Sequence, residues 1–162
     1  MTGSTHPAND AWEALLSAHA VLMKRFAAED IWGDISMREY DVLYTLSKCP
    51  VPVRPSELNR HVLLSQPALS RLADRLAERG FVERKPDPAD GRGVLLSLTP
   101  AGRALQRQVG RWHARDVARA MTAGLTQGEL RQLEAICLKL AGRPAAAAGT
   151  GVALDDKNED AA

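Results

Sequence analysis

The segment between Ser65 and Gly80 constrains the fold of this chain more than any other part of its sequence. Its apolar positions recur at helical spacing, at Leu69, Leu72, Ala73 and Leu76. Positions three and four residues apart lie on one side of a helix, so the segment is predicted to bury a narrow face. Ser65 is a favourable N-cap, and Gly80 is typical of a helix end. The other, mostly polar, side chains are therefore expected to face outward.

Two strand-like runs follow this helix, Phe81–Lys85 and Val94–Thr99. The link Pro86–Gly93 is rich in proline, glycine and aspartate, so it is predicted to be the turn of a β-hairpin. A short helix from Pro55 to about His61 is expected before the segment, and Val51–Val53 is a candidate short strand. A short helix, a turn, a second helix with a polar outer face and a hairpin together form the layout of a winged helix-turn-helix.

Amphipathic helices are predicted on both sides of this motif. A first helix covers about residues 10–28 and carries an apolar stripe. A second helix starts where Ser36 and Glu39 can form a capping box, and the last helix starts at an equivalent pair, Thr126 and Glu129. The apolar positions of the last helix are spaced for packing on another helix: Leu130, Leu133, Cys137 and Leu140.

The sequence therefore predicts a mainly α fold with a small β-hairpin wing (α+β), a winged helix-turn-helix with flanking dimerisation helices. The long helix after Thr99-Pro100, with the first and last helices, carries apolar faces larger than a small winged motif can cover. A homodimer would bury them. The expected divisions are a flexible arm at 1–9, one domain at 10–141 and a disordered tail at 142–162. Within that domain the winged motif covers about 36–99, and the dimerisation helices cover about 10–28 and 100–141.

The net charge of +1 is unevenly distributed. Residues 1–53 carry 4 basic and 7 acidic side chains, residues 54–142 carry 15 and 9, and residues 143–162 carry 2 and 4. The stretch with the predicted motif is thus basic, which favours a polyanionic partner. No apolar run has the length of a membrane span, no secretion signal is present, and two cysteines do not make a disulfide framework. A cytoplasmic protein without a membrane partner is expected.

The outer face of the helix that follows Ser65 carries side chains suited to base edges. A helix fits the major groove, where hydroxyl and amide groups can hydrogen-bond to bases and arginine can bind guanine or phosphate. The hairpin adds basic residues that can reach the backbone or the neighbouring minor groove. The residues expected to contact double-stranded DNA are Ser65, Gln66, Pro67, Ser70, Arg71, Arg75, Arg84, Lys85 and Arg92. Asp74 is expected to pair with Arg71 or Arg75 on the same helix.

Three motifs resemble the MarR family of regulators. They are L-S-Q-P-A-L-S-R-L-A-D-R-L-A-E-R-G-F-V-E-R at Leu64–Arg84, D-P-A-D-G-R-G at Asp87–Gly93 and L-T-P-A-G at Leu98–Gly102. Their order and spacing make the resemblance specific, and it covers roughly residues 10–140. It implies a dimer built from the first and the last two helices, with the winged motif between them.

The resemblance also implies roles for residues of the wing. Asp90 belongs to the expected DNA-binding set for this reason: it is expected to hold Arg92, and Arg92 is expected to enter the minor groove. Many members of the family have a further basic residue directly after this arginine, whereas this chain has Gly93. Fewer wing contacts to DNA are therefore expected here than is usual in the family.

An effector pocket is a further implication of the resemblance, located between the dimer helices and the DNA-binding part. The side chains suited to line it are Trp12, His19, Trp32, Tyr40, Tyr44, Trp112 and His113. Several members of the family respond to aromatic acids or other small anions, so a small aromatic or anionic effector is expected. No histidine lies within metal-ligand spacing of another histidine or a cysteine, so no metal site and no cofactor are predicted.

The principal prediction is a sequence-specific transcriptional regulator, a ligand-responsive repressor that binds a near-palindromic operator as a homodimer. Two alternatives stay open, a thiol-responsive regulator acting through Cys49 and a constitutive DNA-binding protein without an effector. An enzyme is not predicted, because the chain has no phosphate-binding glycine loop, HExxH motif or nucleophile elbow. Cys137 is expected to be a small buried residue of the last helix.

Overall fold

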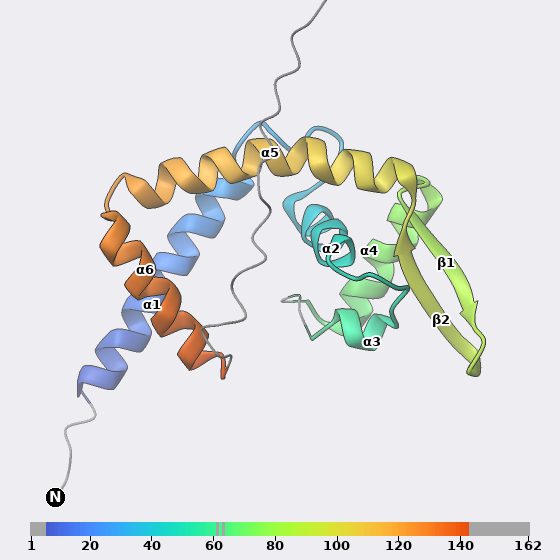
Figure 1. The fold of residues 1–162 in the computed structure, drawn as a ribbon, viewed down its shortest axis with the longest axis horizontal. Coiled ribbons are helices and arrows are strands. Elements are labelled where there is room, and N and C mark those ends of the chain that lie inside the picture. The colour runs from blue at the N-terminus through green and yellow to red at the C-terminus, as the bar shows by residue number, and fades with distance from the viewer. Residues whose placement is uncertain (1–5, 61, 63, 143–162) are drawn as a thin grey trace, which may run out of the picture. The chain divides into compact units, whose positions relative to one another are not determined.

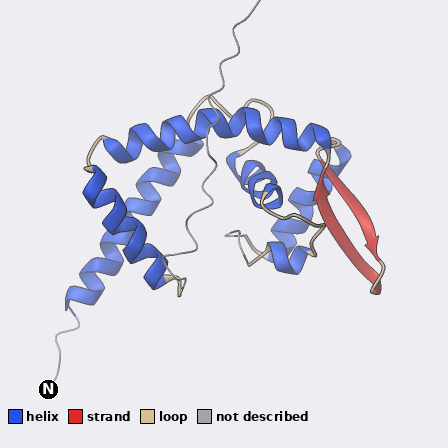
Figure 2. Ribbon diagram, in the orientation of Figure 1, coloured by secondary structure: helices blue, strands red, loops and turns tan. Residues whose placement is uncertain are grey.

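The computed structural model describes residues 6–60, 62 and 64–142. Figure 1 shows its helices and strands, which are α1 (His6–Ala27), α2 (Met37–Ser47), α3 (Pro55–Leu58), α4 (Gln66–Glu78), β1 (Val82–Asp87), β2 (Asp90–Leu98), α5 (Pro100–Thr122) and α6 (Gln127–Leu140). Helices predominate, and the two strands pair as one antiparallel sheet (Figure 2). The predicted class, mainly α with a β-hairpin, is confirmed. The chain forms two compact units, with a boundary between Ala118 and Arg119.

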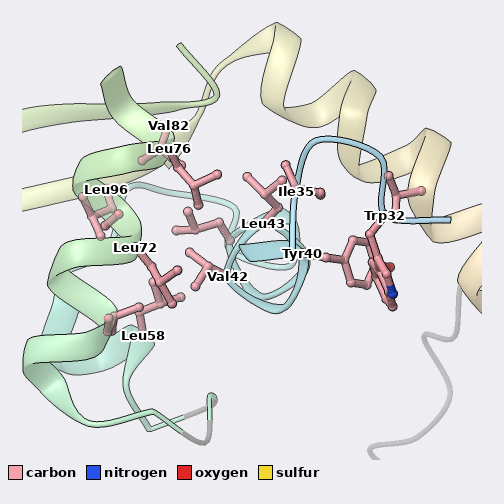
Figure 3. Packing of buried hydrophobic residues seen from close by; sticks show 14 residues of the cluster. Trp32, Ile35, Tyr40, Val42, Leu43, Leu58, Leu72, Leu76, Val82 and Leu96 are labelled. Carbon is pink, nitrogen blue, oxygen red and sulfur yellow. The ribbon is translucent and has the colours of Figure 1, made fainter. Parts of the chain in front are cut away.

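The core of the first unit is the layer between α2 and α4. Val42 and Leu43 of α2 are fully buried, and Figure 3 shows them close to Leu72 and Leu76 of α4. The four positions at helical spacing in α4 are all buried, as predicted. Leu96 of β2 and Leu58 of α3 complete the same cluster. Since this layer excludes water from one side of α4, the opposite side of the helix is left exposed.

The helices whose first turn is capped by a side chain start where the sequence predicts. Ser36 and Glu39 form a capping box at α2, and Thr126 and Glu129 form another at α6. Ser65 caps α4 by accepting a hydrogen bond from the Ala68 amide. Two other boundaries differ from the prediction. The first helix begins at His6 rather than near residue 10, and α3 ends at Leu58, while the expected end at His61 lies outside the described residues.

The hairpin, called the wing below (β1, β2 and their turn), is longer than predicted. Strand pairing continues through most of the segment expected to be a turn, and only Pro88 and Ala89 connect the two strands. The register changes after the pair Pro86–Val94, where Asp87 pairs with Asp90. Pro86 is tolerated because each strand of a two-stranded sheet has an unpaired edge, on which a missing N–H costs nothing.

The predicted short strand before α3 is a single β-bridge. The Val53 amide donates to the Leu96 carbonyl at 3.0 Å, and the Leu96 amide donates to the Val53 carbonyl at 2.8 Å. This pair of hydrogen bonds joins β2 to the segment that leads into α3. The base of the wing is thereby attached to the helical body.

Gly102 lies where α5 begins beside the base of the wing. A Cβ atom at this position would overlap the backbone carbonyl of Phe81, so only glycine permits this approach. The Thr99 hydroxyl oxygen accepts a hydrogen bond from the Gly102 amide at 3.0 Å and donates one to the Gly80 carbonyl at 2.7 Å. Gly80 has a φ of 76°, as expected for the residue that ends α4.

Apolar side chains of α1 and of α6 lie on the surface. In α1 only Phe26 is buried, while Trp12 is 58% exposed and Leu16 is 46% exposed. In α6 no residue is buried, and Leu140 is 72% exposed. Cys137 is exposed as well in the single chain, and its burial against a second helix stays a prediction.

Replacing Leu69 by alanine tests the role of the core layer. Leu69 is fully buried, and truncating such a leucine costs about 2–5 kcal/mol because a cavity remains. We expect the free energy of unfolding, measured by urea denaturation, to fall by that amount. The control is Val51→Ala, at a side chain that is 63% exposed, for which a change within about 0.5 kcal/mol is expected. Equal losses in the two variants would contradict this account.

Candidate nucleic-acid interface

The outer face of α4 presents a row of polar side chains. The predicted DNA contacts on this helix and its cap are all exposed: Ser65, Gln66, Pro67, Ser70, Arg71 and Arg75. They lie opposite the buried face and begin at the first turn, which is the part of a recognition helix that reaches base edges. Hydroxyl, amide and guanidinium groups therefore share one accessible surface.

Glu39 anchors two arginines beside this surface. Its Oε1 lies 3.7 Å from Arg75 Nε and 4.0 Å from Arg79 Nη1. Its Oε2 accepts hydrogen bonds from the Ser36 amide and hydroxyl, each at 2.8 Å. Burial raises the pKa of Glu39, but the bonds from Ser36 and the two arginines outweigh it and hold this pKa below its ordinary value. The N-terminus of α2 is thus joined electrostatically to the second half of α4.

The wing contributes Arg84 and Lys85 from β1 and Arg92 from β2, and all three are exposed. They line one shallow, open hollow on the hairpin. Arg84 forms an ion pair with Asp74 of α4. The expectation that Asp74 pairs within its own helix is therefore wrong, because the strand brings a cation from another element closer.

The turn of the wing is held by aspartate side chains. Asp90 Oδ1 accepts a hydrogen bond from the Arg92 amide at 3.2 Å. The resemblance implied that Asp90 holds Arg92, and the contact observed is with its backbone. The Arg92 side chain is exposed.

Arg54 and Asp87 are functional candidates that the sequence did not indicate. Arg54 Nε donates to Asp87 Oδ2 at 2.6 Å, although the two residues are 33 positions apart. Asp87 Oδ1 accepts a bond from the Ala89 amide at 2.9 Å. This backbone bond, followed by the Arg54 guanidinium, outweighs burial and holds the pKa of Asp87 below its usual value. No local pattern signals such a pair, since both partners read as ordinary polar residues of a cap and a turn.

Aromatic residues expected in an effector pocket are partly brought together. The His113 ring lies 5.2 Å from Trp32, 5.5 Å from Tyr40 and 5.3 Å from Phe26, and Tyr40 stacks on Tyr44 at 5.9 Å. Burial lowers the pKa of His113, against an opposing contribution from Asp116. The remaining residues of the expected set are exposed: Trp12, His19 and Trp112.

The environment of Cys49 does not favour a reactive thiolate. Its thiol donates to the Thr45 carbonyl at 3.4 Å, and burial, followed by the nearby Glu57, raises its pKa. A cysteine is reactive when the pKa of its thiol is lowered. The pKa of Cys49 is raised instead, so its thiol is held in the unreactive protonated form. In the part of the chain that the structure describes, no three metal-ligating side chains gather. The helices described there are also too short or too polar to cross a membrane.

Comparison with known proteins relates this surface to one family. Residues 34–93 match the MarR family. The multiple antibiotic resistance protein MarR of Escherichia coli is 36% identical over 107 residues, which cover 66% of this chain and 74% of that protein. The crystal structure of a mutant of E. coli MarR complexed with operator DNA has a TM-score of 0.68 and 32% identity, over 82% of this chain and 96% of that chain. A MarR family transcriptional regulator from Streptomyces coelicolor, in complex with DNA, shares the fold with a TM-score of 0.74 at 23% identity, over 90% and 94% of the two chains.

The ion pairs of Glu39 predict a pH-dependent contribution to stability. Because the folded-state pKa is held below the ordinary value of 4.5, the stabilisation is fully present above that value and is lost as the pH falls through the folded pKa. We expect Glu39→Gln to lower the free energy of unfolding at neutral pH and to approach wild type in acid. Denaturant unfolding from neutral pH to below 4.5 measures this difference. Glu78→Gln, at an exposed position of α4, is the control. If the difference in unfolding free energy between Glu39→Gln and wild type stayed the same at every pH, the assignment would be contradicted.

Proposed function

Because the chain belongs to the MarR family of transcriptional regulators, we propose that it represses transcription as a homodimer on a near-palindromic operator. The observation that carries this proposal is the surface on which the polar face of α4 and the basic wing are tied together by the Asp74–Arg84 pair. A helix of this kind fits the major groove, and a cationic hairpin beside it can reach the neighbouring minor groove.

In this proposal α4 selects the sequence. Ser65, Gln66 and Ser70 offer hydroxyl and amide groups to base edges in the major groove, where each base pair shows a distinct pattern of donors and acceptors. Arg71 binds the adjacent phosphate. Arg75 forms an ion pair with Glu39, which draws its guanidinium toward the start of α2. Phosphate contacts set the register, and the short polar side chains give specificity.

The wing supplies the second set of contacts. Arg92 enters the flanking minor groove, whose narrow stretches attract arginine. Arg84 and Lys85 lie on the paired strand and neutralise phosphates. Asp90 does not bind DNA itself but orders the backbone that carries Arg92. Gly93 provides no cation, so the wing relies on one arginine in the groove.

The homodimer is supported by the apolar surfaces of α1 and of α6. Trp12 and Leu16 on α1, and Ile136 and Leu140 on α6, are all substantially exposed. Such surfaces are typical of protein interfaces. A twofold axis would bury the same surface of both copies and set two recognition helices about one DNA turn apart.

Regulation by a small aromatic or anionic ligand is the remaining part of the proposal. The Tyr40 ring contacts the rings of Tyr44 and His113. The Lys48 ammonium lies 4.0 Å from the centre of the Tyr44 ring. Rings beside a cation suit an aromatic anion. To regulate, the ligand must bind the DNA-bound and the released states with different affinity. A constitutive DNA-binding protein is the alternative, whereas the raised pKa of Cys49 disfavours a thiol switch.

Binding of the protein to its own upstream intergenic DNA tests the DNA contacts. We expect Arg92→Ala to weaken binding by about 1–3 kcal/mol, as for an arginine that contacts base edges. We expect Arg71→Ala to reduce the slope of log affinity against log salt by about one, as for a phosphate contact. Fluorescence anisotropy at two salt concentrations measures both effects.

The control for this titration is Arg111→Ala, at an exposed arginine of α5. It changes the net charge equally without altering α4 or the wing. Absence of salt-dependent binding by the wild type would refute the proposal, and an Arg111→Ala effect equal to that of Arg92→Ala would refute the assignment of the wing.

Light scattering tests the homodimer. Leu16→Glu places a charge on the apolar surface of α1, where Leu16 is 46% exposed, and burying that charge in an interface would be costly. We expect wild type at micromolar concentration to have the mass of two chains and the variant to shift toward one. Val51→Glu, also at an exposed apolar position, should remain dimeric. A monomeric wild type would contradict the dimer.

A further inference from the structure

We propose that Arg54 and Asp87 are positioning residues that fix the wing for DNA binding, and that neither needs to contact DNA. The inference rests on the proposed function, because it assigns to this ion pair the placement of Arg92. Its basis is a set of contacts that runs from the start of α3 to the tip of the wing. Each contact is made by a side chain with a defined partner.

The first contact joins the helical body to the wing. Arg54 is the N-cap residue of α3, and its amide donates to Glu57 Oε2 at 3.3 Å, so its backbone is held in place. Its guanidinium Nε donates to Asp87 Oδ2 at 2.6 Å. The Asp87 side chain is only 5% exposed, so Arg54 supplies the charge partner that a carboxylate removed from solvent requires.

The second contact orders the turn. The other oxygen of the same carboxylate, Asp87 Oδ1, accepts from the Ala89 amide at 2.9 Å. A single side chain thus binds the helical body with one oxygen and the tip of the hairpin with the other. The strand register changes at Asp87, and a Cβ atom on Gly93 would lie 3.0 Å from Asp87 Cβ, so glycine makes room for this arrangement.

The third contact leads to the DNA-binding arginine. Asp90 follows the turn that Asp87 orders, and Asp90 Oδ1 accepts from the Arg92 amide. At its base the wing is already attached through the Val53–Leu96 bridge. The Arg84–Asp74 ion pair attaches the opposite strand to α4 at the same level, since Arg84 pairs with Leu96. The Arg54–Asp87 pair, made by the residue next to Val53, is a further attachment that lies nearer the tip and restricts the direction of the turn.

Electrostatics gives this proposal a distinctive prediction. A carboxylate near a DNA-binding surface repels phosphates, so its removal should strengthen DNA binding if the carboxylate has no other role. If Asp87 positions the wing, its removal should weaken DNA binding instead. The two interpretations therefore predict effects of opposite sign for one substitution.

The experiment compares wild type with Asp87→Ala, Arg54→Ala and the double variant on the upstream intergenic DNA, after circular dichroism has shown that all are folded. We expect each single variant to bind between about twofold and thirtyfold more weakly, the range of effects for residues that act through others. The double variant should bind DNA no more weakly than the single variant with the lower affinity, because the two substitutions remove the same interaction. Arg54→Ala should leave the salt slope unchanged, since no phosphate contact is lost. Glu83→Ala, which removes an exposed carboxylate of the same hairpin, should not weaken binding.

Hydrogen exchange of the protein without DNA provides an independent measurement. The amides of Ala89 and Arg92 should exchange faster in both single variants, while amides of the α2–α4 core should be unchanged. Tighter or unaltered binding by Asp87→Ala, additive losses in the double variant, or unaltered exchange at Ala89 would overturn the proposal. If wild type itself fails to bind DNA, the proposed function fails, and the exchange data still decide whether the pair orders the wing.

Discussion

The burial of one face of α4 under α2 is the constraint on which the DNA-binding surface depends. Leu69 and Leu76 can leave water only if the helix takes one rotation about its axis, and that rotation turns Ser70 and Arg71 outward. In the proposed complex, specificity for bases therefore depends on core packing as much as on the polar residues themselves. A change in the core that rotated α4 would redirect every contact, even with all polar side chains intact.

Carboxylates organise the positive charge of this surface. Glu39, Asp74 and Asp87 each pair with arginine from a different element of the chain. An exposed pair such as Asp74–Arg84 adds little to stability, because solvent screens it and ordering the side chains costs entropy. The carboxylates of Glu39 and Asp87 are largely buried and need their charge partners. All three pairs also link elements that, in the proposed complex, fit the same DNA.

Local and non-local features differed in how well the sequence predicted them. The capping boxes depend on residues three positions apart, so Ser36 with Glu39 could be found by inspection, as could the buried face of α4. The Arg54–Asp87 pair depends on a β-bridge that brings distant segments together, and no spacing rule encodes it. The predicted length of the hairpin turn was too great for a related reason. Proline and glycine indicate a break in local structure, but pairing with a second strand extended β1 as far as Asp87.

The contact of Gly102 with the Phe81 carbonyl has a consequence for motion. Where two backbones touch without side chains between them, there is no rotamer that can change to absorb a displacement. Thr99 adds hydrogen bonds on both sides of this contact. The base of the hairpin and the first turn of α5 should consequently move as one rigid lever, so that a force applied at either one is transmitted to the other rather than dissipated in a flexible joint.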